Sequence, residues 1–141
     1  MKNPAYPSNL RYSATHEWVR IEDDQTVTVG ITQHAQHLLG DLVFIELPKL
    51  NRHAEMGEEI AVVESVKTAA DVYSPIQGAV IAVNETLQQT PGTVNTDPYG
   101  AGWLFQLKMK DKTQLEKLLD AQKYQALIET NIIPSPSQGE G

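Results

Sequence analysis

The feature that most constrains the fold is a series of short β-type segments, separated by turn-forming residues about every eight to twelve positions. Short strands at this spacing are typical of a mainly β barrel or sandwich. No segment repeats with a fixed period. The expected strands are, in chain order, residues 16–21, 26–30, 42–47, 59–65, 69–73, 79–84 and 103–109.

Helices are expected at two places among these strands. Thr32 can cap a short helix over residues 33–39, which Gly40 would end. Asp111 and Gln114 have the spacing of a capping box and predict the start of a helical C-terminus. The sequence therefore predicts a β body with one short internal helix and a helical end.

The remaining segments set the expected boundaries of one domain. Residues 1–11 are rich in Pro and Asn and are expected to fray or lie loosely on the surface as an N-terminal extension. Residues 95–102 predict a long irregular loop. The end of the chain has turn formers and no apolar anchor, so residues 132–141 are expected to form a disordered tail. The folded domain would then span residues 12–131.

Composition excludes several classes of function. Lys and Arg number 11 against 18 Asp and Glu, a net charge of −7, whereas nucleic-acid binding needs clustered basic residues. There is no cysteine, so disulfides, thiol nucleophiles and cysteine zinc sites are excluded. The longest apolar runs have four or five residues, and the N-terminus has no apolar signal segment. We therefore expect a cytoplasmic protein with no membrane or nucleic-acid partner.

The only metal-ligand candidates are two histidines. His34 and His37 lie three residues apart on the expected helix, so they share a face and could hold a metal in a small metallohydrolase. No third ligand stands at a recognisable spacing, and neighbouring surface histidines are common. No nucleophile or phosphate-loop motif is present either. We expect no metal site and no catalytic residue.

Lys67 is the residue most open to a functional interpretation. It lies between two expected strands in Glu64-Ser65-Val66-Lys67-Thr68-Ala69, at the tip of a tight hairpin. A surface lysine usually needs no explanation, and spacing alone favours that ordinary reading. A hairpin tip nevertheless holds one amine far from the body, as an enzyme that acylates a single lysine would need. The chain could thus be a carrier of a reactive group, or a binding module whose lysine stays unmodified.

Separated motifs in a fixed order show a family resemblance between about Leu10 and Thr130. The chain resembles the glycine cleavage H-protein family, whose fold is a lipoyl-domain-like barrel-sandwich hybrid with short flanking helices. The segments that carry the resemblance are 13–19 (SATHEWV), 28–32 (TVGIT), 35–36 (AQ), 39–41 (LGD), 64–67 (ESVK), 71–75 (DVYSP), Gly78 and 94–103 (VNTDPYGAGW).

The resemblance implies a non-catalytic carrier with lipoate in amide linkage on Lys67. Members of the family receive an aminomethyl group from a pyridoxal-phosphate-dependent glycine decarboxylase. They then serve a tetrahydrofolate-dependent aminomethyltransferase and a dihydrolipoyl dehydrogenase that uses FAD and NAD. A lipoate-attaching enzyme would be a further partner, and the carrier alone is expected to be a monomer.

The resemblance also implies roles for five other residues. Glu64 and Gly78 match positions associated with recognition for lipoylation, although Gly78 also has a structural explanation as a turn residue. Glu17 and Asp71 match positions that line a cleft in which the loaded arm rests, and Thr15 could join them because it stands beside Glu17 in sequence. Glu17 could equally be the polar face of a strand. This chain departs from the family pattern in the same region, where Leu38 occupies a cleft-side position that is polar in some members.

Other carriers remain as alternatives. Biotinyl domains use a similar hairpin but have Met on both sides of the lysine, where this chain has Val66 and Thr68. Lipoyl domains of 2-oxo acid dehydrogenases typically show Asp-Lys-Ala at this position. A lipoyl relay that donates lipoate to other complexes cannot be separated from a glycine cleavage carrier by sequence.

Overall fold

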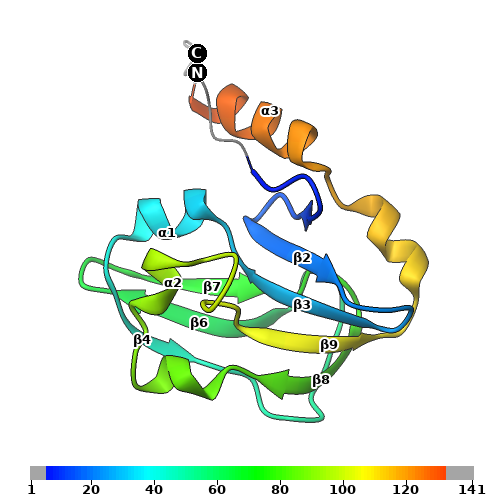
Figure 1. The fold of residues 1–141 in the computed structure, drawn as a ribbon, viewed down its shortest axis with the longest axis horizontal. Helices are drawn as coiled ribbons and strands as arrows, with labels where there is room; N and C mark the ends of the chain where they lie inside the picture. The colour runs from blue at the N-terminus through cyan, green and yellow to red at the C-terminus, as the bar shows by residue number, and fades with distance from the viewer. Residues whose placement is uncertain (1–5, 133–141) are drawn as a thin grey trace.

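The computed structural model describes residues 6–132 and consists mainly of two antiparallel β-sheets, which do not close into a barrel (Figure 1). The larger sheet has the strand order β1-β2-β3-β9-β8-β5, and the smaller has the order β4-β6-β7. The larger sheet comprises β1 (Arg11–Tyr12), β2 (Glu17–Ile21), β3 (Thr26–Ile31), β9 (Phe105–Met109), β8 (Gly78–Val83) and β5 (His53–Ala54). The smaller comprises β4 (Leu42–Glu46), β6 (Glu59–Ser65) and β7 (Ala69–Tyr73).

Short helices connect and flank the sheets. They are α1 (Gln33–Leu39), the 3₁₀ helix η1 (Glu85–Gln88), α2 (Thr93–Thr96), the 3₁₀ helix η2 (Lys112–Lys117) and α3 (Ala121–Ile132). Within residues 6–132, none is long and apolar enough to cross a membrane.

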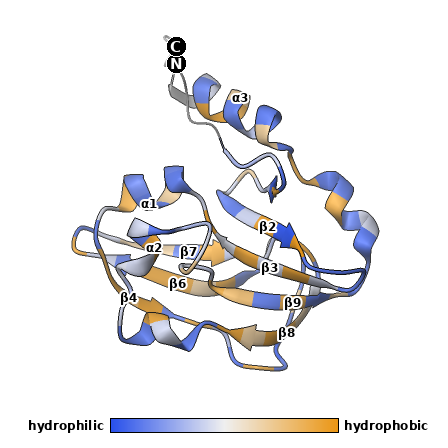
Figure 2. Ribbon diagram, in the orientation of Figure 1, coloured by the Kyte–Doolittle hydropathy of each residue, from blue (hydrophilic) through white to orange (hydrophobic). Residues whose placement is uncertain are grey.

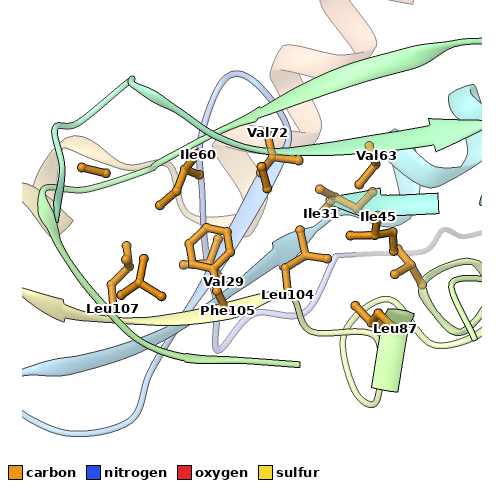
Figure 3. Packing of buried hydrophobic residues seen from close by; sticks show 14 of the residues in the cluster. Val29, Ile31, Ile45, Ile60, Val63, Val72, Leu87, Leu104, Phe105 and Leu107 are labelled. Carbon is orange, nitrogen blue, oxygen red and sulfur yellow. The ribbon is translucent and has the colours of Figure 1, made fainter. Parts of the chain in front are cut away.

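The main hydrophobic core lies between the two sheets. Figure 3 shows Val29, Phe105 and Leu107 of the larger sheet facing Ile60 and Val72 of the smaller one. All five side chains are at most 3% exposed. Burial of apolar area between the two layers is the dominant stabilising contribution for a chain of this kind.

A second, smaller cluster covers the outer side of β2. Trp18 is fully buried there, and its indole N–H donates to the carbonyl of Pro98 at 2.9 Å. The other buried members are Leu10, Tyr12, Tyr124 and Ile128. This cluster explains why α3 has an apolar stripe on an otherwise polar helix (Figure 2).

Several predicted elements are confirmed by the structure. Strands β6 and β7 have the expected bounds, 59–65 and 69–73. The helix over residues 33–39 is also present, capped by the Thr32 hydroxyl, which accepts from the Ala35 N–H at 3.1 Å. Gly40 ends this helix with a φ of 86°.

Both predicted termini need correction at their boundaries. Residue 11 begins β1, and Leu10 is only 3% exposed, so this part of the predicted loose extension is anchored in the second cluster. At the other end α3 continues to Ile132, one residue beyond the predicted domain. The predictions for residues 1–5 and 133–141 concern segments outside the described residues.

Three internal predictions were also inaccurate. The predicted 95–102 loop begins inside α2, and the predicted alternation of β2 fails because Trp18 is as buried as Val19 on the opposite face. At the predicted capping box, the side chain of Gln114 accepts from the Gln77 N–H at 2.7 Å instead of returning to Asp111. The predicted helical start is nevertheless present, because Asp111 caps the 3₁₀ helix η2 by accepting from the Thr113 N–H.

Candidate functional site

The tip of the β6–β7 hairpin holds Lys67 on a hydrogen-bonded turn. The Ser65 hydroxyl accepts from the backbone N–H groups of Lys67 at 3.2 Å and Thr68 at 3.1 Å. The Ser65 N–H donates to the Thr68 carbonyl at 2.7 Å and closes the turn. The exposed Lys67 side chain therefore starts from a fixed backbone.

The same tip lies against the C-terminal end of α1. The Lys67 ammonium donates to the carbonyl of Leu38 at 3.4 Å, and the Val66 N–H donates to the carbonyl of Asp41 at 3.2 Å. A Cβ at Gly40 would lie 3.2 Å from Lys67 Cε, and its backbone is left-handed. Glycine at this position therefore both ends the helix and leaves room for the lysine stem.

A cleft of about 170 Å³ opens between α1, the start of β2 and the strands β6 and β7. Its apolar lining includes Leu38 and Leu39, and its polar lining includes Thr15, Glu17 and Asp71. Larger grooves of about 650 and 810 Å³ run beside β4, but neither is lined by Glu17. The small cleft is the stronger candidate because it combines a buried carboxylate with a wall formed by α1, the helix that Lys67 contacts.

Glu17 is the most unusual group in this cleft. Its side chain is 1% exposed, and its carboxylate accepts from the hydroxyls of Ser13 and Thr15 and from the Tyr73 N–H at 3.0 Å. Burial raises the pKa of Glu17, and these hydrogen bonds oppose that shift. Among residues 6–130, no basic side chain forms an ion pair with Glu17.

The structure separates the remaining predicted residues from the cleft. Glu64 pairs with Phe44 and Ala69 across the smaller sheet and does not line the cleft. Gly78 lies in the other sheet, paired with Ala54 and Met109. Only Thr15, Glu17 and Asp71 of the predicted set come together.

Sequence reasoning missed a group of polar residues behind the cleft, in which Thr32 and Tyr124 are fully buried and His16 is half-buried. His16, which lines the cleft, has its Nδ1 atom 2.7 Å from the Tyr124 hydroxyl, and that hydroxyl is 2.8 Å from the hydroxyl of Thr32. Burial, and secondarily the neighbouring His34, lowers the pKa of His16. His16 and Tyr124 are 108 positions apart, so no local pattern could have joined them.

The two histidines considered as metal ligands have a different environment. The His34 ring lies against the His16 ring, with centroids 4.8 Å apart. In the described part of the chain, no three His, Asp or Glu side chains are grouped so that they could hold a metal ion.

Fold and site together define a protein of the lipoyl-domain class, with one lysine displayed on a hairpin tip beside a small cleft. A family model described as "Glycine cleavage H-protein" matches residues 10–131. The chain belongs to this family.

Individual relatives agree with this assignment. The glycine cleavage system H protein of Coxiella burnetii (strain Dugway 5J108-111) is 60% identical over 124 residues, covering 88% of this chain and 95% of the relative. That of Idiomarina loihiensis is 55% identical over 123 residues, covering 87% and 95%. A crystal structure of a glycine cleavage system H protein from Mycobacterium marinum is 38% identical, with a TM-score of 0.82, covering 88% of this chain and 99% of that one.

Proposed function

We propose that this chain is the lipoylated carrier of a glycine cleavage system, with lipoate in amide linkage to the Nζ atom of Lys67. The observation that carries the proposal is an exposed lysine on a rigid hairpin tip, next to a cleft that holds a buried carboxylate. It would take an aminomethyl group from a glycine decarboxylase to an aminomethyltransferase, and then meet a dihydrolipoyl dehydrogenase. The chain itself would catalyse no step.

The residues at the tip fit an amide-linked arm. Acylation removes the charge of the Lys67 ammonium group, whose only hydrogen bond in the described structure is the 3.4 Å contact with the Leu38 carbonyl. The bound lipoate would supply a disulfide that opens to accept the aminomethyl group and later closes again. Lys67 acts as a tether, and Ser65 fixes the direction in which the tether leaves the hairpin.

The cleft residues fit a cationic cargo. Glu17 lacks a basic partner in the described structure, so an ammonium group at this place would stabilise its carboxylate and lower its raised pKa. Thr15 and Asp71 would add polar contacts from the two sides. The apolar side chains of Leu38, Leu39 and Ile31 would limit the access of water.

Transient contacts with several partners are part of the proposal. An arm on one fixed point reaches different active sites by effective concentration rather than by tight binding. The net charge of −7 favours basic rims at the entrances of those sites. We propose a monomer that acts in the cytoplasm, and that Glu64 and Gly78 help a lipoate-attaching enzyme to recognise the hairpin.

Mass spectrometry of the protein purified from its own cells tests the proposal. The peptide that contains Lys67 is expected to be heavier by the mass of one lipoyl group. This added mass should be absent in Lys67→Arg and present in the control Lys110→Arg. A biotinyl increment would move the chain to another class of carrier. An unmodified Lys67, even after incubation with lipoate and a lipoate ligase, would overturn the proposal.

A further inference from the structure

We infer that Tyr124, in the C-terminal helix α3, is a positioning residue that fixes two walls of the cleft through its hydroxyl group. We call the contacts of the Tyr124 hydroxyl with His16 and Thr32 the clamp. The clamp does not depend on the proposed function, but its consequence for a loaded arm rests on that function. Tyr124 does not line the cleft, so it acts only through the residues that it holds.

The hydroxyl of Tyr124 connects segments that are distant in sequence. The side chain is fully buried, and its hydroxyl lies 2.7 Å from His16 Nδ1 and 2.8 Å from Thr32 Oγ1. Its ring stacks on Tyr12, with centroids 4.7 Å apart and planes 5° apart. The ring therefore anchors α3 on the second cluster, and the hydroxyl extends from that anchor toward the cleft walls.

The first wall is the segment that leads into β2. His16 lines the cleft between Thr15 and Glu17, and its φ of 77° lies in the left-handed region, which is uncommon for residues other than glycine. Such a conformation persists only where the surroundings hold it. The contact between His16 and Tyr124, together with the Thr32 N–H that donates to the His16 carbonyl at 3.1 Å, provides this support.

The second wall is α1. This helix has only seven residues, so its stability depends on its ends and its packing. Its N-cap is Thr32, the other partner of the Tyr124 hydroxyl, and its face toward the cleft carries Leu38 and Leu39. A single buried hydroxyl thus holds the N-terminus of the helix and the neighbouring loop in one arrangement.

The hydrogen-bonding groups are matched in either protonation state of His16. When Nδ1 carries no proton, the tyrosine donates to it and accepts from Thr32. When Nδ1 is protonated, the ring donates to the tyrosine, which donates to Thr32. Tyr124→Phe would leave the fully buried Thr32 and the half-buried His16 without this partner, which is costly in either state.

The test compares Tyr124→Phe with the matched control Tyr12→Phe in the unmodified protein. Tyr12 belongs to the same ring stack, but its hydroxyl donates to the Pro7 carbonyl at 2.6 Å and does not touch the cleft walls. Tyr124→Phe is expected to speed hydrogen exchange of the Ala35 and Gln36 amides about fivefold, the factor of one ordinary hydrogen bond. It should also lower the pKa of His16 further in an NMR titration, because the charge-assisted hydrogen bond lost by the protonated ring is stronger than the bond lost by the neutral ring.

The control should change neither readout. Equal effects of the two variants, or no effect of Tyr124→Phe on either readout, would overturn the inference.

The loaded carrier gives a second measurement. Spontaneous loss of the cargo consumes one water, breaks the carbon–sulfur and carbon–nitrogen bonds of the aminomethyl group, and yields the thiol, formaldehyde and ammonium. Ammonium release should be faster in Tyr124→Phe than in Tyr12→Phe, and equal rates would overturn the connection between the clamp and the cargo. If Lys67 bears no lipoyl group, the proposed function fails, while exchange and titration in the unmodified protein still decide on the clamp.

Discussion

At the scale of single residues, Glu17 is subject to two opposing influences. Burial raises its pKa, and hydrogen bonds from Ser13, Thr15 and Tyr73 lower it, with burial the larger effect. A carboxyl group whose pKa is raised in the folded state contributes stability below its ordinary value of 4.5. That contribution is lost as the pH rises through the folded-state pKa. Ionisation of Glu17 therefore weakens the fold relative to its protonated form.

Glu17→Gln tests this sign. The amide oxygen can accept from the Tyr73 N–H while the amide nitrogen donates to the Ser13 and Thr15 hydroxyls, so the contacts are kept without the charge. Relative to the original protein, the variant should therefore have a larger free energy of unfolding at pH 8 than at pH 4. Urea denaturation at the two pH values measures this difference. A variant that loses more stability at pH 8 would mean that the carboxylate stabilises the fold.

A substitution at Gly78 tests whether this glycine is needed for packing or for recognition by a lipoate-attaching enzyme. A Cβ at Gly78 would lie 2.5 Å from the backbone carbonyl oxygen of Lys108 on the paired strand, whereas a Cβ at Gly92 would meet nothing within 4 Å. Gly78→Ala should lower the free energy of unfolding by about 1–3 kcal/mol, the range for overpacking. Gly92→Ala should change it by less than about 0.5 kcal/mol. If Gly78→Ala is as stable as Gly92→Ala but is no longer lipoylated, recognition rather than packing explains the glycine.

At the scale of elements, α2 attaches α1 to the smaller sheet through one side chain. The Asn95 amide nitrogen donates to Gln36 Oε1 and to the Gly40 carbonyl, each at 2.9 Å, and its oxygen accepts from the Leu42 N–H at 2.9 Å. These bonds join the middle of α1, its end and the first residue of β4. The position of α1 beside Lys67 depends on this connection.

Asn95→Asp should therefore destabilise the protein by about 2 kcal/mol, because two donors are replaced by a carboxylate oxygen facing other oxygens. Asn51→Asp makes the same chemical change at an exposed site with a φ of 73°, where Asp is tolerated, and should be nearly neutral. Thermal denaturation of both variants at pH 7 gives the comparison. Similar melting temperatures for the two variants would contradict the role assigned to Asn95.

The elements found from sequence are those with local causes. The Thr32 cap, the Gly40 stop and the β6–β7 hairpin with Lys67 at its tip each depend on neighbours within a few residues. The missed features depend on distant partners. Gln114 turns away from its capping box to bind Gln77, 37 positions away, and Trp18 is buried by residues from both ends of the chain. Local patterns therefore located the tip, while the contacts that hold the walls of the cleft could be seen only in three dimensions.

At the scale of the whole molecule, the two ends of the described part of the chain meet on one side of the larger sheet. Tyr6 and Tyr124 pack edge to face with centroids 5.0 Å apart, and Figure 1 shows α3 beside the N-terminal segment. Among the described residues, Lys67 and Leu38 stand at the other end of α1 from this cluster. The arrangement leaves the hairpin tip exposed to partners while the terminal segments stabilise the cleft from behind.

Two half-buried histidines of this arrangement make the overall stability depend on pH. Burial lowers the pKa of both His16 and His34, with smaller contributions from His34 on His16 and from His37 on His34. A group with a lowered pKa contributes stability above its ordinary value of 6.5, and this contribution is lost as the pH falls through the folded-state pKa. The free energy of unfolding should therefore decrease between pH 7 and pH 5. Glu17 acts in the opposite direction, so the decrease should be steeper in Glu17→Gln.

His16→Asn isolates the histidine contribution, because Asn tolerates a left-handed backbone and does not titrate. Guanidinium denaturation in steps from pH 8 to pH 5 should give a flatter profile for this variant than for the original protein. His53→Asn removes a histidine that is exposed in β5 and should leave the slope unchanged. If His16→Asn and His53→Asn follow the same slope as the original protein, proton uptake by His16 on unfolding is not the cause of the acid destabilisation. The contact between His16 and Tyr124 would then stabilise the fold equally at both ends of the pH range.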